Sequence, residues 1–351
     1  MGIDAMREFA ERTVVIASDS FKECLSSVEV CNIIADEIAG LHPGWRLVKC
    51  PLSDGGEGFS EVLSERLGAE LVCVRVTGPL GESLEARYGR KGDTAIMDVA
   101  SACGLQLVNP AERNPLLATT KGVGEMMLSA YKAGCRRFVL GLGGSATCDG
   151  GAGMMSVRGL QEIAGDIKIE VLCDVVNPFI GTDGAARVFG PQKGASPAVV
   201  ELLEERMRER AETILRETGT DVSLLPGAGA AGGIAGSLLA YFDAALLPGI
   251  DTFLDYVGFD ELVGEAGLVI SGEGRSDSQT LMGKAPFGVL RRTSAGVPVI
   301  LISGTVEDRA ALLGAGFSEA VQITPAGMPL AEAVKPCTAE RNLRSAVKAL
   351  F

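Results

Sequence analysis

Charged and polar residues gather in several glycine-rich stretches of this chain, and their types suit work on anions. Two aspartates, Asp174 and Asp277, each follow a predicted strand, where a carboxylate could accept a proton or hold a cation. The only histidine, His42, lies in a turn-like Leu-His-Pro-Gly sequence, which argues against a Ser-His-Asp triad or a multi-histidine metal site. The cations that could face a phosphate or carboxylate in these stretches are Lys22, Lys193, Arg275 and Lys284.

Several of these residues also have an ordinary structural explanation. Asp54 and Glu57 could cap the helix that follows them by accepting its unpaired backbone N–H groups. Arg275 and Asp277, two residues apart, could simply pair with each other. No single motif is decisive, and the functional interpretation depends on several such clusters occurring together.

Two further positions favour a ligand that carries phosphate. Lys22 lies at the start of a predicted helix, where the helix dipole disfavours a cation and so makes an anion partner attractive. Asp174, with Asn177 shortly after it, is either a turn former or part of an oxygen pair of the kind Mg²⁺ uses. Glycine-rich loops at the carboxyl ends of strands would also expose backbone N–H groups to a phosphate.

The common nucleotide fingerprints are absent or lack their structural context. No G-x-x-x-x-G-K-[ST] sequence occurs, so the chain has no Walker A loop. Residues 227–232 and 141–146 match the dinucleotide pattern G-x-G-x-x-G/A, but the first lacks a convincing strand before it. The second runs into another glycine cluster instead of a regular helix. Both observations disfavour a dinucleotide site.

Composition limits the class of protein. The formal net charge of −13 argues against nucleic acid or an anionic membrane as a partner. Nine cysteines without a C-x-x-C sequence indicate reduced thiols and a cytoplasmic location. Residues 1–12 are charged and contain no apolar run, so they predict a disordered lead-in and no signal peptide. The uncharged stretch 222–242 contains a proline and several glycines, which favours a loop and a buried helix over a membrane span.

Strands and helices alternate near both ends of the chain, whereas the middle contains a hairpin at 83–99 and longer helices. This pattern predicts an α/β protein of two domains. The first is a Rossmann-like domain with a parallel sheet, made of residues 13–79 and 266–351. The second is a mixed-sheet α/β domain inserted between them at 80–265. The oligomeric state is left open.

The ordered set of motifs resembles bacterial type I glycerate kinases over nearly the whole chain, from Val14 to Phe351. The matching stretches are SDSFK at 18–22, SDGGEG at 53–58, GGSATCDGG at 143–151, CDVVNP at 173–178, FGPQKGA at 189–195, PGAGAAGG at 226–233 and GEGRSDSQT at 272–280. Three departures stand out. Cys148 replaces the usual Asn, Glu23-Cys24 replaces Gly-Ser, and the connection at 159–168 is shorter than usual.

The resemblance implies that ATP phosphorylates D-glycerate, with 2-phosphoglycerate and ADP as products, in a cleft between two domains. Because both substrates are anions, Arg275 is expected to bind the glycerate carboxylate as a bidentate pair. Lys22 or Lys193 would face the transferring phosphate as a compact charge. The other residues expected to bind substrate or phosphate are Asp19, Ser20, Asp54, Glu57, Gly143, Gly144, Ser145, Thr147, Asp149, Gln279, Thr280 and Lys284.

With no usable histidine, the general base must be a carboxylate. Asp277 is the expected base and Asp174 the alternative, and whichever is not the base would bind Mg²⁺ with Asn177. Two other functions stay open at this point. An NAD-dependent hydroxy-acid dehydrogenase would use one of the G-x-G runs, and a non-catalytic two-domain protein would close on a small acid.

Overall fold

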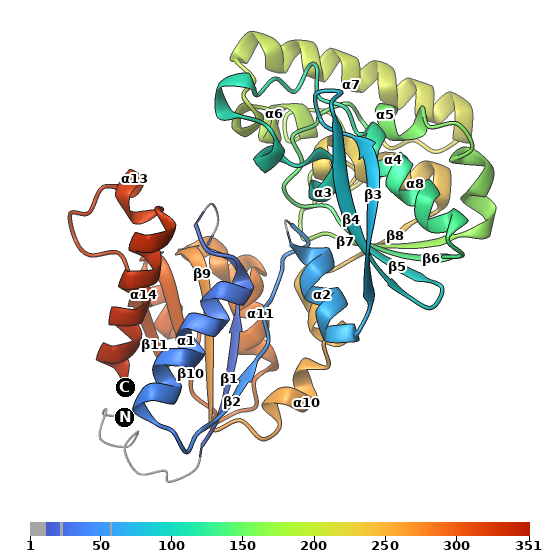
Figure 1. The fold of residues 1–351 in the computed structure, drawn as a ribbon. Helices are drawn as coiled ribbons and strands as arrows, with labels where there is room; N and C mark the ends of the chain where they lie inside the picture. The colour runs from blue at the N-terminus through green and yellow to red at the C-terminus, as the bar shows by residue number, and fades with distance from the viewer. Residues whose placement is uncertain (1–11, 22–23, 57) are drawn as a thin grey trace. The chain divides into compact units, whose positions relative to one another are not determined.

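The computed structural model describes residues 12–21, 24–56 and 58–351, which form two compact units, each with its own sheet (Figure 1). Unit 1 combines the described residues up to Ser53 with Phe253–Phe351, and unit 2 is Asp54–Thr252. One sheet is parallel and the other mixed, so the expected α/β class is confirmed.

Unit 1 is built on a five-stranded parallel sheet in the order β11-β10-β9-β1-β2. The central strands are nearly continuous apolar runs, as parallel strands covered on both faces require. The five strands are β1 (Thr13–Ser18), β2 (Arg46–Lys49), β9 (Leu268–Ser276), β10 (Val299–Val306) and β11 (Glu319–Gln322).

Helices cover both faces of this sheet. On one face, α1 (Ser27–Leu41) and α14 (Pro336–Leu350) lie side by side over a shared apolar core, and on the other α11 (Ala285–Arg292) contacts β9 and β1 (Figure 1). A capping box between Ser26 and Glu29 fixes the start of α1. The shorter helices of the unit are α10 (Phe259–Val263), α12 (Arg309–Gly314), α13 (Leu330–Ala333) and the 3-10 helix η6 (Ser278–Met282).

The turn after α1 holds a small aromatic cluster. The ring of His42 stacks on Trp45 with a centroid separation of 4.1 Å. The C-terminal Phe351 meets both rings edge-on, at 6.3 Å from His42 and 5.8 Å from Trp45. The C-terminus is thereby packed against the end of α1.

Unit 2 contains a six-stranded sheet in the order β3-β4-β5-β6-β7-β8. The first three strands pair antiparallel and the last four pair parallel. The strands are β3 (Glu70–Thr77), β4 (Ser83–Lys91), β5 (Thr94–Asp98), β6 (Arg137–Gly141), β7 (Lys168–Leu172) and β8 (Ala245–Leu247). Its helices are α2 (Phe59–Leu67), α3 (Ala100–Cys103), α4 (Lys121–Lys132), α5 (Ala152–Met155), α6 (Ala185–Phe189), α7 (Pro197–Thr218) and α8 (Ala230–Phe242), with α9 (Gly249–Tyr256) crossing into unit 1.

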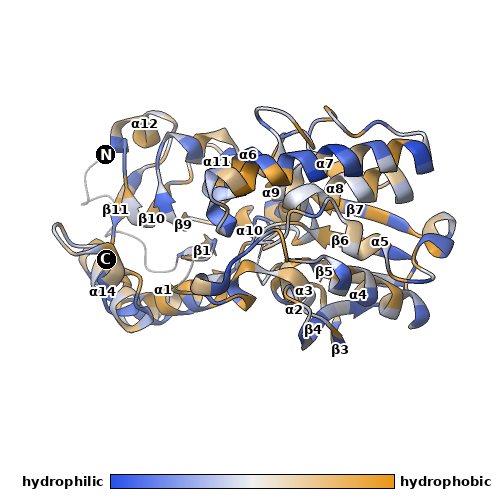
Figure 2. Cartoon of the chain, turned by 90° about the horizontal axis from the view of Figure 1, so that it is seen from above, coloured by the Kyte–Doolittle hydropathy of each residue, from blue (hydrophilic) through white to orange (hydrophobic). Residues whose placement is uncertain are grey.

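The 22-residue helix α7 is amphipathic. Its buried residues, among them Leu203, Met207 and Ile214, recur at helical spacing, and Figure 2 shows the alternation of hydrophilic and hydrophobic residues along it. The uncharged stretch at 222–242 forms a loop and the buried, kinked helix α8. Within the described ranges, no helix has both the length and the apolarity needed to cross a membrane.

The compact units divide the chain elsewhere than at the expected boundaries 79/80 and 265/266. Strand β3, expected in the parallel sheet, pairs antiparallel with β4 and so belongs to unit 2. Its side chains alternate between more and less exposed, which suits an edge strand covered on one face. At the other boundary, Arg292 of α11 pairs with Asp255 and Asp260, which ties residues 253–265 to unit 1.

Candidate active site

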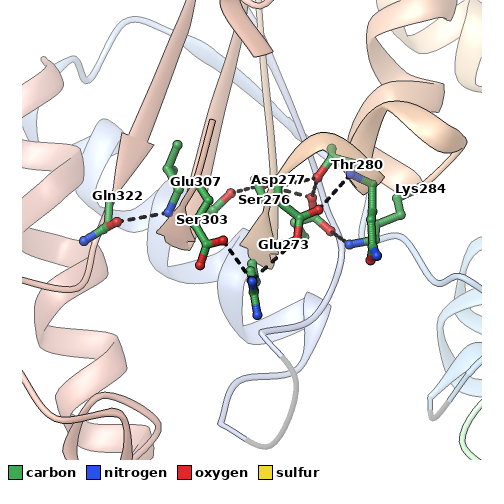
Figure 3. Close-up of polar contacts among 11 residues, drawn as sticks. Glu273, Ser276, Asp277, Thr280, Lys284, Ser303, Glu307 and Gln322 are labelled. Atoms are coloured by element: carbon green, nitrogen blue, oxygen red, sulfur yellow. Dashed lines mark hydrogen bonds and ion pairs between the residues drawn. The ribbon is translucent and has the colours of Figure 1, made fainter. Parts of the chain in front are cut away.

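Glu273 is the centre of a polar cluster at the carboxyl end of β9 in unit 1 (Figure 3). Its Oε1 accepts hydrogen bonds from the hydroxyls of Ser276 at 2.9 Å and Thr280 at 2.5 Å. Its Oε2 lies 3.6 Å from the ammonium of Lys284. Burial raises the pKa of Glu273, against the opposing effects of Thr280, Lys284 and Ser276.

Asp277 begins the 3-10 helix η6 next to this cluster. Its Oδ1 accepts the backbone N–H of Gln279 at 2.8 Å, and its own N–H donates to the Thr280 hydroxyl at 3.1 Å. Arg275 lies between two carboxylates, with Nε 3.5 Å from Asp277 and Nη2 2.9 Å from Glu307. Asp277 and Arg275 therefore pair, as their structural explanation predicts, and most of the Arg275 side chain remains exposed.

The end of β1 lies beside the end of β9. The backbone N–H of Asp19 donates to the Gly272 carbonyl at 2.9 Å, and the Asp19 carboxylate accepts the N–H of Ser20 at 2.7 Å. Most candidates of unit 1 are thus brought to one edge of the parallel sheet, whereas Lys22 lies outside the described residues. Glu273 was missed as a site residue, and its place within the matching stretch GEGRSDSQT at 272–280 was the signal that could have found it.

In unit 2, two glycine-rich loops touch through their backbones. The Gly143 N–H donates to the Gly55 carbonyl at 2.8 Å, and a Cβ on Gly143 would lie 2.6 Å from the Gly56 Cα. The carboxylate of Asp54 accepts the Gly56 N–H at 3.1 Å and so supports this turn. It does not cap α2, whose N-cap is Gly58, and Glu57 lies outside the described residues.

Lys193 is enclosed by the protein and does not project from a loop as expected. Its ammonium donates to the Ser145 hydroxyl at 2.9 Å and to the Thr147 carbonyl at 2.6 Å, so it braces the loop that follows β6 from inside. Desolvation lowers the pKa of Lys193. Packing of the loop over the lysine stem buries the charge, so the Lys193 ammonium faces Ser145 and Thr147 instead of solvent.

Asp149 and Asp174 also have structural partners. Asp149 accepts hydrogen bonds from the Thr120 N–H and hydroxyl and from the N–H groups of Gly151 and Gly153, at 2.9–3.0 Å. It therefore fixes the starts of α4 and α5, and both its oxygens are occupied.

Asp174 accepts the N–H groups of Gly249 at 2.7 Å and Ile250 at 3.3 Å, at the start of α9. Desolvation raises the pKa of Asp174, and the carboxylates of Asp54 and Asp251 add to the rise. Asn177 has a different partner, because its Nδ2 donates to the Asp183 carbonyl at 2.9 Å. The described residues contain no group of three His, Cys, Asp or Glu side chains that could enclose a metal.

Comparison with known proteins covers nearly the whole chain. The model of the "Glycerate kinase family" matches residues 14–164 and 155–351. A glycerate kinase of Bacillus cereus is 41% identical, over 95% of this chain and 96% of that one. A glycerate 2-kinase of Escherichia coli is 40% identical, over 84% of this chain and 86% of that one.

The chain belongs to the glycerate kinase family. A crystal structure described as glycerate kinase 2 from Salmonella typhimurium has a TM-score of 0.78 and 37% identity, with 97% of each chain covered. The resemblance inferred from the motifs is confirmed, and the chain is an enzyme that phosphorylates an alcohol group of glycerate. These matches give no support to the dehydrogenase or to a non-catalytic binding protein.

One departure from the glycerate kinase motifs lies beside a pocket. Cys148 and Asp149 line a pocket of about 310 Å³ together with Arg206 and Arg210 of α7. Burial raises the pKa of Cys148 to about 11, so its thiol is neutral near pH 7. The shortened connection at 159–168 contains the 3-10 helix η4 (Gln161–Asp166).

Proposed function

We propose that this glycerate kinase transfers the γ-phosphoryl group of ATP to D-glycerate and forms 2-phosphoglycerate and ADP. The observation that carries the proposal is the cluster at the end of β9, where Lys284 pairs with the buried Glu273 and Arg275 pairs with the neighbouring Asp277. Phosphoryl transfer mainly requires that two anions be positioned and their charge neutralised. The name of the E. coli relative supports the 2-phosphorylated product.

In unit 1, we assign the glycerate carboxylate to Arg275. Its guanidinium is held on one side by Glu307, at 2.9 Å, and a planar fork of donors suits bidentate binding of a carboxylate. Asp277 is the proposed base for the glycerate hydroxyl. The carboxylate and the hydroxyl of glycerate are neighbours, as Arg275 and Asp277 are in this loop. Lys284, with 41% of its side chain exposed, would neutralise phosphate charge.

In unit 2, the loop after β6 is the proposed phosphate-binding element. The Lys193 ammonium occupies a lone pair of the Ser145 hydroxyl, which leaves the Ser145 hydrogen free to donate to an anion. Gly143 lets this loop approach the Gly56 backbone closely, and Gly144 takes the left-handed conformation that favours glycine, with φ 77°. Lys193 would then act on phosphate through Ser145, without touching it.

The donor set of unit 2 fits a magnesium ion bound mainly through ATP. Mg²⁺ typically uses one or two protein carboxylates together with phosphate oxygens and water, so a full cage of protein ligands is not needed. Each oxygen of the Asp174 carboxylate keeps a lone pair beyond its bond to the start of α9, and Asn177 supplies an amide oxygen. We propose these two residues as ligands. When bound, Mg²⁺ would neutralise phosphate charge during transfer.

The activity is tested with purified protein, D-glycerate, ATP and Mg²⁺. We expect ADP to form only when glycerate is present, phosphorus NMR to show 2-phosphoglycerate, and EDTA to abolish the reaction. ADP release that is independent of glycerate would contradict the proposed function. Formation of the 3-phosphorylated isomer alone would contradict the proposed product.

Asparagine substitutions distinguish the proposed roles of Asp277 as the base and Asp174 as a Mg²⁺ ligand. Asn caps a helix about as well as Asp, so Asp277→Asn preserves the start of η6 but removes the proton acceptor. We expect kcat to fall by about 10²–10⁴-fold, with KM little changed. Asp174→Asn keeps an oxygen but removes a charge, so the Mg²⁺ concentration that gives half-maximal activity should rise. If Asp277→Asn is active and Asp174→Asn is inactive at every Mg²⁺ concentration, the roles are exchanged.

Arg275→Ala tests the substrate contact. A charge-assisted hydrogen bond contributes about 1.5–3 kcal/mol in the ground state and the transition state alike. The substitution should therefore raise KM for glycerate by about 10–150-fold and leave KM for ATP unchanged. A fall confined to kcat would assign Arg275 to the transferring phosphate instead.

We also propose that the enzyme works in the reducing environment of the cytoplasm, on small molecules alone. All nine cysteines are free thiols in the structure. The net charge of −13 disfavours polyanionic partners.

A further inference from the structure

Glu273 holds three structural elements together through a directed set of hydrogen bonds. A hydroxyl has one hydrogen, and Ser276 gives its hydrogen to Glu273, so Ser303 of β10, 2.6 Å away, must donate to Ser276. Thr280 of η6 likewise donates to Glu273 and accepts the N–H of Asp277. The hydroxyls of Ser276 and Thr280 thus share one acceptor, the Glu273 carboxylate, and Figure 3 draws these contacts.

The cluster joins the residues proposed for catalysis to the rigid sheet. Asp277 connects to Glu273 through a single hydroxyl, that of Thr280, and Lys284 connects through its ion pair of 3.6 Å. Glu273 itself is only 7% exposed and lies in the second half of β9. It is therefore poorly placed to touch a substrate and well placed to orient the groups that do.

Burying an ionised carboxylate costs free energy unless hydrogen bonds and a nearby cation compensate for its lost hydration. Burial raises the pKa of Glu273, so its ionised form is less stable in the folded protein than in the unfolded chain. The charged groups that face it are Lys284 and Asp277. Because the folded-state pKa of Glu273 lies above its unfolded value, the stability that its protonated form contributes at low pH is lost as pH rises from the unfolded to the folded pKa. Near pH 8, a neutral side chain of the same shape should make the fold at least as stable.

We infer that Glu273 is a positioning residue for glycerate phosphorylation, whose negative charge orients Lys284 and, through Thr280, the backbone of Asp277. This inference depends on the proposed function of the same loop. It differs from a structural role in one decisive respect, because it predicts that removing the charge lowers activity without lowering stability.

Glu273→Gln is the test, because the amide keeps the shape and can still accept from both hydroxyls, but it lacks the charge that holds Lys284. A misplacement of about 1 Å can reduce turnover about 10²-fold, so we expect a loss of this order in kcat/KM. Tm at pH 8 should be equal to or above that of the wild type. The acidic limb of the pH profile of kcat/KM should move to lower pH, because the group with the raised pKa is gone.

A double-mutant cycle with Lys284→Met tests the proposed link. If Glu273 acts through Lys284, the Lys284→Met substitution should have a smaller effect on kcat/KM in the Glu273→Gln background than in the wild type. The matched control is Glu204→Gln on α7, another buried glutamate, which pairs with Arg208 at 2.8 Å and lies outside the proposed machinery. It should lower Tm and leave kcat/KM unchanged.

These experiments distinguish a failure of the inference about Glu273 from a failure of the proposed function. Full activity of Glu273→Gln, or an unmoved acidic limb, would overturn the inference while wild-type turnover of glycerate keeps the proposed function. A fall in both activity and Tm would also overturn it, in favour of a structural role. If the wild type does not phosphorylate glycerate, the proposed function fails first.

Discussion

Lys193 is buried, and its ammonium donates a hydrogen bond to the hydroxyl of Ser145 in the loop that follows β6. Because desolvation lowers the pKa of Lys193, the folded state holds this proton less tightly than the unfolded chain does. The charged lysine therefore destabilises the fold at neutral pH, and this penalty fades as pH rises toward the unfolded pKa of about 10.4. The phosphate proposed to bind at this glycine-rich loop would offset the penalty, because it places a negative charge near the lysine.

Lys193→Met tests this explanation, because methionine fills most of the space of the lysine stem and carries no charge. We expect Tm to rise relative to the wild type at pH 7, with the difference shrinking toward pH 10. KM for ATP should increase by about 10–150-fold, the equivalent of one charge-assisted hydrogen bond. Ser145→Ala should raise KM for ATP by a similar factor. The double variant should raise KM little further, because both substitutions interrupt the same contact between Lys193 and the phosphate through Ser145. Additive effects would show that Lys193 does not act through Ser145.

Thiol reactivity provides a second test at the level of residues. Burial raises the pKa of Cys31 and Cys103 to about 12 and that of Cys148 to about 11. Because the thiolate is the nucleophile, iodoacetamide at pH 8 should label the exposed Cys73 and Cys337 and leave these three unmodified. Mass spectrometry of the native and the urea-unfolded protein gives the comparison. Rapid labelling of Cys148 in the native protein would show that the motif loop opens.

At the level of elements, the contact between the loops at 54–56 and 141–143 admits no side chain. Gly143→Ala would place a Cβ 2.6 Å from the Gly56 Cα, and two backbones would have to separate. We expect a loss of about 1–3 kcal/mol in the free energy of unfolding, together with reduced activity. Gly165→Ala is the control, because a Cβ there meets nothing within 4 Å. Equal stability of the two variants would contradict the close approach.

The elements that the sequence predicted well have local signals. Helix α7 begins at Pro197 and ends at Thr218, because Ser196 caps it and Gly219 closes it in the left-handed region. Strand β3 was placed in the wrong sheet because pairing depends on which partner covers its face, and this is decided by β4 and not by β3 alone.

The proximity of the candidate residues in unit 1 could be predicted from the sequence, whereas their roles and their burial could not. Arg275, Asp277, Thr280 and Lys284 are close in sequence, so one loop was bound to bring them together. Burial of Glu273 and Lys193 is different, because it is produced by residues far away along the chain, such as Ser303 for Glu273. A sequence shows that a charge is present, but tertiary packing determines whether it faces solvent or the interior.

At the level of the whole molecule, each unit has a hydrophobic core of its own. One core joins β1, β9 and β10 to α1 and α14, and another lies between the sheet of unit 2 and its helices. Because the cores are separate, we expect the chain to unfold in more than one transition. We expect the calorimetric enthalpy to exceed the van't Hoff enthalpy, and ATP with Mg²⁺ to shift part of the heat absorption to higher temperature. Equal enthalpies would show that the two units unfold together.

The aromatic cluster after α1 gives this protein a built-in optical probe of one unit. Trp45 is the only tryptophan of the chain, and it lies in unit 1, stacked on His42 and in contact with the terminal Phe351. Indole emission therefore reports the melting of unit 1 alone, while calorimetry detects both units. Any group attached to the chain after Phe351 would lie close to the Trp45 ring, 5.8 Å from that of Phe351, and so could change the emission that reports on unit 1.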